Sequence, residues 1–291
     1  MQSPTVADEI SRLHRSGARP TYVIPPGNAG DGLISLGFFD LAERIGLEYT
    51  TCTPQNIPST TEPVIFGGGG GLGGGWSTDY REIIWGEAKS ERRVLVMPLT
   101  VVGQEEFLSD LGANVTIFAR EHRSHDHLQA HATNGAQVGL DHDTAFHLDA
   151  RAFLNRSPRP ERPRVSRLKD AARHVLYTAA WTRALKVKHA QAFRVDREAK
   201  EVPEIKRTLR RDFSLLASFG LESREECEYT GYKLLSLIDR YAEVSTDRLH
   251  VAIGSLLLGK HVHLYDNAYF KIRAVYEMSM SSSAVEMKHF A

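Results

Sequence analysis

The sequence has few cysteines, no long apolar run and no leader pattern at its start. Cys52 and Cys227 are its only cysteines and lie far apart, which fits a reducing compartment and argues against a disulfide framework or a cysteine-ligated metal centre. No apolar window reaches the length that spans a bilayer, and the first residues lack the apolar core of a signal peptide. We therefore expect a cytoplasmic protein.

An excess of charge of one sign is also missing. The 36 basic and 36 acidic residues cancel to a formal net charge of zero, so no global basic surface indicates a nucleic-acid partner. Hydrophobic residues make up 42% of the chain and charged residues 25%, as in an ordinary globular protein. The 291 residues reach the size, about 250–300 residues, at which single cores stop growing. Two domains are expected.

What the sequence does contain is an alternation of two patterns. Short runs rich in Val and Ile, at 21–25, 63–66, 94–98 and 115–119, predict strands that are buried on both faces. Segments with apolar residues at helical spacing separate these runs, which is typical of a mostly parallel sheet with helices on both faces. Residues 1–155 are therefore predicted to form an N-terminal Rossmann-like α/β domain.

A change of composition precedes a second alternation. Residues 156–188 are rich in Arg, Lys and Pro and predict a basic linker with a helix. Residues 189–291 predict a second Rossmann-like α/β domain. Its expected elements are strands at 189–195, 241–245 and 261–265 and helices at about 222–239 and 247–259. Two such domains facing one another leave a ligand-binding cleft at the carboxyl ends of both sheets.

The first candidate site is PPGNAGDGL, residues 25–33. It follows a predicted strand, and Asp31 stands where a helix N-cap belongs. Asn28 and Asp31 are polar groups at a strand's carboxyl end, and free N–H groups at a helix start favour an anion. The alternative is that Asp31 only caps the helix, a task for which Asp is well suited.

The glycine-rich run VIFGGGGGLGGGW, residues 64–76, is the second candidate. It lacks the Lys and Ser/Thr of a phosphate-binding P-loop, and the next strand lacks the acidic end of a dinucleotide site. Gly69 and Gly70 could still let a ligand approach the backbone closely, because no Cβ intervenes. A tight structural loop is an equal alternative.

The third candidate follows the strand at 115–119, where Arg120 and Glu121 come at the expected carboxyl edge of the sheet. An arginine there is suited to a carboxylate or phosphate, and Ser124 is expected to cap the next helix and to contribute to substrate binding. A solvated helix start is the alternative. The neighbouring histidines have no spacing of a known zinc motif, so no metal site is predicted.

The segment YAEVSTDRLHVAIGSLLLGK is the most informative. It predicts a strand, a cap at residues 245–247, and then Arg248 and His250 in the first turn of an apolar helix. Two basic side chains at a helix N-terminus oppose the helix dipole, and an anionic ligand would resolve this conflict. His250 is also a candidate for proton transfer.

Taken together, these motifs resemble the polysaccharide pyruvyl transferases. The segments that carry the resemblance occur in order along the chain: GNAGD (27–31), FGGGGG (66–71), FAREHRS (118–124), GLDHDTAFHL (139–148), FRVDREA (193–199), TDRLHVAIGSLLLGK (246–260) and YDNAYFK (265–271). The Arg-Leu-His step at 248–250 is the most specific of them.

The resemblance implies a GT-B-like glycosyltransferase architecture and transfer of pyruvate from phosphoenolpyruvate onto sugar hydroxyls as a ketal, in exopolysaccharide or cell-surface glycan biosynthesis. The donor is a substrate, and no cofactor or metal is expected. Basic residues of the family correspond to Arg120, Arg248 and His250, with the backbone of Leu249 near the donor phosphate. Arg194 is a further candidate for the donor's anions, and Asp31 or Glu121 for the base.

Other interpretations stay open. A nucleotide-sugar glycosyltransferase would share the architecture, and a non-catalytic glycan-binding relative would share the fold. The acceptor is a saccharide, and a lipid-linked one would bring the basic segment 156–188 to an anionic membrane surface; a solvated basic helix is the alternative. The sequence does not specify the acceptor sugar or the oligomeric state.

Overall fold

The protein is described here by a computed structural model, which covers residues 4–73, 78–161, 168–183, 188–196, 211–266 and 270–288. Its internal contacts divide the chain into two compact units. The first unit comprises Met1–Pro26 and Gly37–His147, and the second comprises Gly27–Leu36 and Leu148–Ala291. The boundary thus lies eight residues before the predicted one, and residues 27–36 belong with the second half of the chain.

The packing of helix α2 (Ala29–Ile45) explains why residues 27–36 belong to the second unit. Its first turns pack against the second unit, because glycines there leave room for its leucines. A Cβ on Gly231 would lie 2.3 Å from Leu36 Cδ1, and one on Gly254 would lie 3.2 Å from Leu33 Cδ1. Leu33 and Leu36 are both buried, so the helix start is held by apolar packing within the second unit.

A seven-stranded parallel sheet forms the centre of the first unit, with the order β2-β1-β3-β5-β6-β7 and β4 beside β5. Its strands are β1 (Thr21–Val23), β2 (Thr50–Cys52), β3 (Val64–Phe66), β4 (Gly69–Leu72), β5 (Val94–Val101), β6 (Val115–Ala119) and β7 (Gln137–Leu140). β1, β3, β5 and β6 are the four strands expected from the Val/Ile-rich runs, and all their residues are buried.

The glycine tract differs from the expectation of a bend or loop, because Gly69–Leu72 is a strand that pairs with β5. Close neighbours from the adjacent strand ends explain the two glycines before it. A Cβ on Gly68 would lie 2.1 Å from the carbonyl oxygen of Pro98. One on Gly67 would lie 2.3 Å from Pro25 Cδ. Residues without a Cβ are therefore required here, because adjacent strand ends approach the glycines closely.

The other elements of the first unit are mostly short helices. They are α1 (Val6–Arg15), η1 (Pro54–Asn56), α3 (Thr78–Ala88), α4 (Glu105–Ser109), α5 (His122–His131) and η2 (Thr144–His147). Helix α1 begins with a capping box, in which the Thr5 side chain and the Asp8 side chain each accept from the other's backbone N–H.

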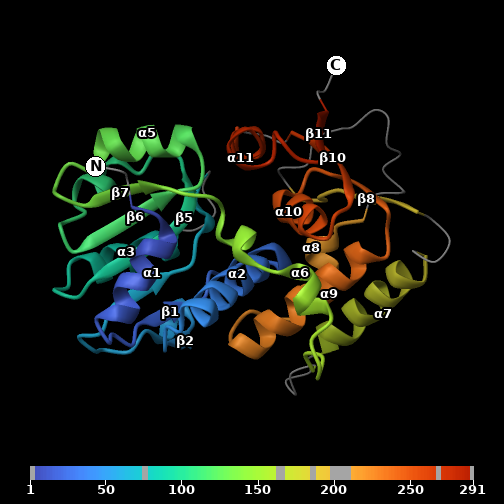
Figure 1. The fold of residues 1–291 in the computed structure, drawn as a ribbon, viewed down its shortest axis with the longest axis horizontal. Helices are drawn as coiled ribbons and strands as arrows, with labels where there is room; N and C mark the ends of the chain where they lie inside the picture. Colours follow the sequence, from blue (N-terminus) through green and yellow to red (C-terminus); the bar gives the residue numbers. More distant parts are fainter. Residues whose placement is uncertain are drawn as a thin grey trace. The chain divides into compact units, whose positions relative to one another are not determined.

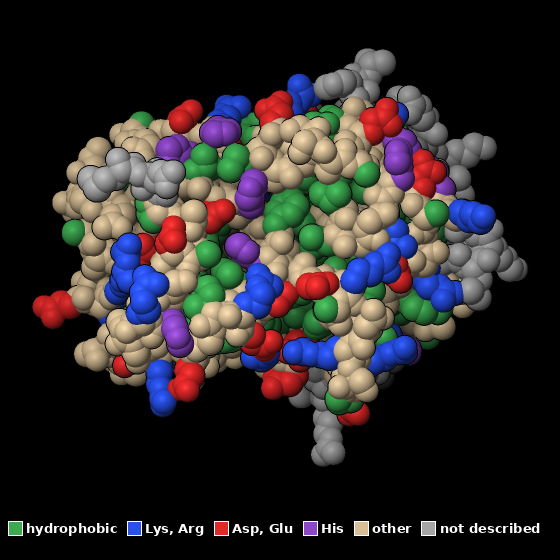
Figure 2. All heavy atoms as spheres, viewed as in Figure 1, with side chains coloured by type: hydrophobic (Ala, Val, Ile, Leu, Met, Phe, Trp, Pro, Cys, Tyr) green, Lys and Arg blue, Asp and Glu red, His purple; other side chains and the backbone are tan. Residues whose placement is uncertain are grey.

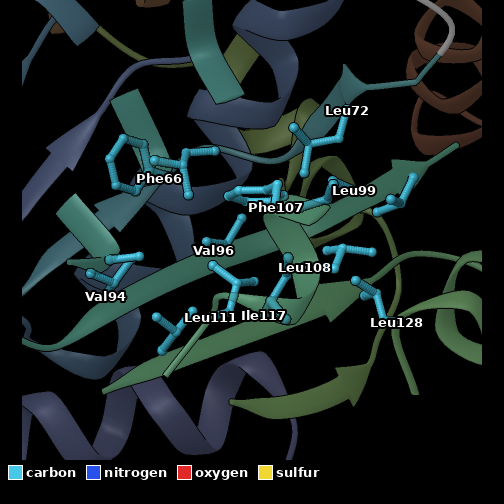
Figure 3. Packing of buried hydrophobic residues seen from close by; sticks show 14 of the residues in the cluster. Phe66, Leu72, Val94, Val96, Leu99, Phe107, Leu108, Leu111, Ile117 and Leu128 are labelled. Atoms are coloured by element: carbon cyan, nitrogen blue, oxygen red, sulfur yellow. The ribbon is translucent and has the colours of Figure 1, made fainter. Parts of the chain in front are cut away.

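One hydrophobic core lies between this sheet and helices α3, α4 and α5. Figure 3 shows Phe107 and Leu108 lying over the β5 side chains Val96 and Leu99. Phe107 is 1% exposed, and full burial of such a side chain contributes about 1.5–3 kcal/mol. The core thus fixes the strand ends that carry the first unit's polar residues.

The second unit contains a four-stranded parallel sheet with the order β11-β10-β9-β8. Its strands are β8 (His189–Ala192), β9 (Glu243–Thr246), β10 (His261–Tyr265) and β11 (Val285–Lys288). Its helices are α6 (Ala150–Leu154), α7 (Leu168–Arg183), α8 (Phe213–Leu216), α9 (Arg224–Asp239), α10 (Leu249–Leu257) and α11 (Lys271–Ser279). Figure 1 shows α9 and α10 beside one another, and the two helices are in contact.

The predicted fold class is confirmed at the level of a mixed α/β fold with parallel sheets and helices. The GT-B-like architecture stays a prediction. Within the described residues, no helix is both long enough and apolar enough to cross a membrane. On the face that Figure 2 shows, acidic and basic side chains are interspersed, in keeping with the balanced charge of the sequence.

Candidate functional site

The candidate site lies in the second unit, where β8 and β9 end. The two strands are parallel and in register, with Ala192 opposite Thr246, so the residues that follow them meet at the carboxyl edge of the sheet. The backbone N–H of Arg194 donates to Asp247 Oδ1 at 2.8 Å. Ligands of α/β proteins bind at such edges.

Two arginines and three aspartates form one network at this edge. Arg248 Nη2 lies 2.8 Å from Asp196 Oδ2 and 2.5 Å from Asp212 Oδ2. Arg194 Nε donates to Asp196 Oδ1 at 2.8 Å, and its Nη2 donates to Asp196 Oδ2 at 3.2 Å. Because Arg194, Arg248 and Asp212 are buried, these pairs hold both guanidinium groups more firmly than exposed pairs would.

Arg248 occupies the N-cap position of α10, one residue before the predicted first turn, and no side chain caps this helix. Its Nε is buried and has no hydrogen-bond partner among the described residues. Burial lowers the pKa of Arg248, but the carboxylates of Asp212, Asp196 and Asp247 together outweigh this effect and the net pKa is raised. A fixed positive charge with an unsatisfied N–H therefore stands at an uncapped helix start, an arrangement suited to an anion.

Asp247 adds a proton-binding group to the same edge. Burial raises the pKa of its carboxyl to about 6, although the hydrogen bond from the Arg194 backbone and the Arg194 and Arg248 charges act in the opposite direction. It was expected to cap the helix after β9. The strand instead runs to Thr246, whose hydroxyl accepts from the Arg248 N–H at 3.0 Å. Asp247 can thus hold or release a proton near neutral pH.

The loop at residues 28–31, which belongs to the first candidate motif of the sequence, lies against His250 at this site. A Cβ on Gly30 would lie 2.7 Å from His250 Nδ1 and 3.1 Å from Asn28 Oδ1, so the imidazole rests on the bare Cα of this glycine. Ser218 Oγ accepts from the Ala29 N–H at 2.8 Å and holds the same loop. Residues more than 200 positions apart in the chain are therefore brought together within one unit.

Asn28 and Asp31 organise the helix start beside His250. Asn28 Oδ1 accepts from the Gly30 N–H at 2.9 Å, and Asp31 Oδ2 accepts from the Asn28 N–H at 2.8 Å. Because α2 begins at Ala29, Asp31 lies in its first turn and is not the N-cap that the sequence suggested. Leu249, whose backbone was expected near the donor phosphate, is the first residue of α10.

Arg120, Glu121 and Ser124 belong to the first unit. Arg120 is 1% exposed; its Nη1 lies 2.7 Å from Asp143 Oδ2, and its Nε donates to Thr100 Oγ1 at 2.9 Å. Glu121 caps α5 by accepting from the Ser124 N–H, whereas Ser124 was expected to be the cap. The Ser124 hydroxyl instead accepts from the Val101 N–H at 2.8 Å.

The remaining predicted residues, Gly69 and Gly70, lie in β4. Roles for these glycines and for Arg120, Glu121 and Ser124 in ligand binding stay predictions. Sequence reasoning missed Asp196, Asp212 and Asp247 as partners of the arginines. Asp247 directly follows β9, and Asp196 lies four residues after the end of β8. A polar residue just after a strand is the pattern that could have identified them.

Comparison with known proteins identifies the family to which the chain is similar. The sequence model of the family described as polysaccharide pyruvyl transferase matches residues 28–269. A crystal structure of a functionally uncharacterised protein from Klebsiella pneumoniae subsp. pneumoniae is similar to this chain, with a TM-score of 0.71 and 27% sequence identity over 98% of this chain and 99% of the other. No curated protein sequence matches significantly.

The matched residues 28–269 include the 28–31 loop, both arginines of the network and His250. They cover most of the chain, so the match describes the protein as a whole and not one local motif. The chain belongs to the polysaccharide pyruvyl transferase family.

Proposed function

We propose that this enzyme transfers pyruvate from phosphoenolpyruvate onto two hydroxyls of a saccharide and forms a cyclic ketal. The observation that carries the proposal is Arg248 at the uncapped start of α10, with a buried Nε that has no partner among the described residues. Phosphoenolpyruvate presents a carboxylate and a phosphate, and either group can accept from this N–H and from the helix start.

The reaction that we propose begins with attack of one sugar hydroxyl on C2 of phosphoenolpyruvate. A proton is added to the methylene carbon, which becomes the methyl group, and the hydroxyl gives up its own proton. The C2–O bond to phosphate then breaks, and inorganic phosphate leaves. Attack of the second hydroxyl on the resulting oxocarbenium carbon closes the ketal and releases the second proton.

In this scheme, His250 delivers a proton or holds the departing phosphate, and Arg248 and Arg194 hold the donor's anionic groups. Asp196 and Asp212 orient the Arg248 guanidinium and keep it charged. Asp247 is placed to accept a proton at the same edge. Two proposals come from the sequence alone: Arg120 as a further ligand of the donor, and Asp31 or Glu121 as the base. Asp31 and Glu121 both accept hydrogen bonds at helix starts.

The test is to incubate the purified chain with phosphoenolpyruvate and a panel of simple and lipid-linked glycosides. The expected result is release of inorganic phosphate together with a glycoside whose mass has increased by one ketal-linked pyruvate. A matched reaction with nucleotide sugars in place of phosphoenolpyruvate is the control. Release of a nucleoside diphosphate there, with no ketal product from phosphoenolpyruvate, would instead identify a glycosyltransferase.

A further inference from the structure

The amino ends of β9 and β10, at the edge of the sheet away from the proposed active site, carry a cluster of nitrogen and oxygen ligands. Glu243, His261 and His263 place one ligand atom each within 4.8 Å of one another; these three residues are called the His–Glu cluster. Glu243 is the first residue of β9, and Asp247 follows its last residue. Four residues of extended strand separate the two by about 13 Å.

Strand geometry explains why these side chains converge. Glu243 and His261 are register partners on neighbouring parallel strands, so their side chains project from the same face of the sheet. His263 follows two residues later on β10 and projects from that face as well. A His-x-His step on a strand beside a carboxylate therefore aims three ligands at one point.

A carboxylate lies beside each ring nitrogen of His263. Its Nε2 is in close contact with Glu243 Oε1. Its Nδ1 lies 3.1 Å from Glu286 Oε2. On the other side of Glu243, His189 Nδ1 lies 3.9 Å from Glu243 Oε2, and His189 Nε2 lies 2.8 Å from Ser245 Oγ. The hydrogen bond with Ser245 thus orients His189, as such bonds commonly do for metal-ligating histidines.

We propose that the His–Glu cluster binds a divalent transition metal, with Zn²⁺ as the ion of best chemical fit. Two imidazoles and one carboxylate are a ligand set that Zn²⁺ uses, with a fourth position for water or for His189. The bound ion would join β9 and β10 and stabilise the second unit by linkage. The site is independent of the proposed pyruvyl transfer, since it lies at the opposite edge of the sheet.

A second group of similar composition, Glu105, His127 and His131 in the first unit, provides an internal comparison. There, His127 Nε2 lies 2.8 Å from the carbonyl oxygen of Gly103 and is already engaged with backbone. Its ligand nitrogen would have to exchange a hydrogen bond for the metal. In the His–Glu cluster, His263 instead contacts the side chains of Glu243 and Glu286, which can turn toward an ion without loss of a backbone hydrogen bond, so we expect the sheet site to bind first.

The test is a titration of the tag-free, metal-stripped chain with Zn²⁺ by calorimetry, and with Co²⁺ by visible absorption. The wild-type chain is expected to take up one equivalent tightly, and its Tm is expected to rise by about 5 °C or more at a large excess of Zn²⁺ over Kd. His261→Ala and His263→Ala should each weaken this equivalent more than about 100-fold. His261 is exposed, so its variant is expected to fold normally.

His131→Ala is the matched control from the first unit and should leave the tight equivalent in place. The proposal is overturned if the wild-type chain binds neither ion, or if both sheet variants bind as the wild type does. It is also overturned if only His131→Ala abolishes binding, because the ion would then lie in the other group. Phosphoenolpyruvate-dependent product formation is measured separately and plays no part in these outcomes.

Discussion

The contribution of an ion pair to the stability of this protein depends on whether its charged side chains are buried or exposed to water. Arg120 and Asp143 form an ion pair in which both side chains are buried, 1% and 0% exposed, so each charge helps to compensate the other. Arg19 and Glu48 form a pair of similar length at the surface, where their side chains are 72% and 71% exposed. Their different burial leads to different expected energies.

Asp143→Ala is expected to reduce the free energy of unfolding by about 3–5 kcal/mol, because it leaves the Arg120 charge buried without its partner. Glu48→Ala is the control and should change it by less than about 1 kcal/mol. Urea denaturation of both variants measures the difference. Equal and small effects of the two changes would show that the Arg120–Asp143 pair is not buried as described.

Asp247 gives the stability of the protein a defined dependence on pH. Burial raises the pKa of its carboxyl in the folded chain to about 6, from the ordinary value of 3.8. Between these two pH values the folded state holds a proton that the unfolded state has released. Stability contributed by this group is therefore present at low pH and is lost as the pH rises through about 6.

Asp247→Asn removes this titration while keeping an oxygen that can accept from Arg194. The unfolding free energy of the variant relative to the wild type should therefore increase by about 2 kcal/mol between about pH 4 and pH 8, at about 1.4 kcal/mol for each pKa unit. Denaturant unfolding across this pH range measures it. A difference that does not change with pH would contradict a raised pKa for Asp247.

At the scale of elements, the contact between the α2 start and the α10 start decides where His250 lies. Gly30→Ala places a methyl group within 2.7 Å of His250 Nδ1 and 2.9 Å of its Cβ, so the imidazole must move. A displacement of about 1 Å at a reacting group can reduce turnover about 100-fold. We expect kcat for pyruvyl transfer to fall by at least about tenfold in this variant. The same kinetic assay gives the KM for phosphoenolpyruvate separately.

Gly86→Ala is the matched control, since Gly86 lies in helix α3 and a Cβ there would meet nothing within 4 Å. This change should leave activity unaltered and raise stability by about 0.8–1 kcal/mol, the difference in helix propensity. A Gly30→Ala variant as active as Gly86→Ala would show that His250 does not depend on this contact.

The elements that the sequence predicted best are those with one strong local pattern. Strand β10 occupies the predicted residues 261–265, and β6 the predicted 115–119. The edge strands β2 and β11 were missed because TTC and VEMK contain no apolar run; most of their residues are only partly buried or exposed, so none is required. The glycine strand β4 lacks β-propensity altogether and is specified by its neighbour β5.

The site was predicted less completely than the fold, for a reason that applies to the molecule as a whole. Arg194, Arg248, His250 and the 28–31 loop were selected as candidates because each stands beside a strand or helix end, which is a local signal. Asp212 is 36 residues from Arg248, to which it is hydrogen-bonded, and no local pattern links such partners. Likewise, only the tertiary packing of α2 shows that residues 27–36 belong to the second unit.

The central claim for the whole molecule is that His250, beside Arg248 at the start of α10, takes part in pyruvyl transfer. The most direct measurement is ketal formation from phosphoenolpyruvate by His250→Ala, with His14→Ala as a control on the exposed side of α1 in the first unit. We predict a loss of about 100- to 10,000-fold in kcat for His250→Ala, the range for a general acid or base, and unchanged activity for His14→Ala. Full ketal formation by a folded His250→Ala variant would contradict the account.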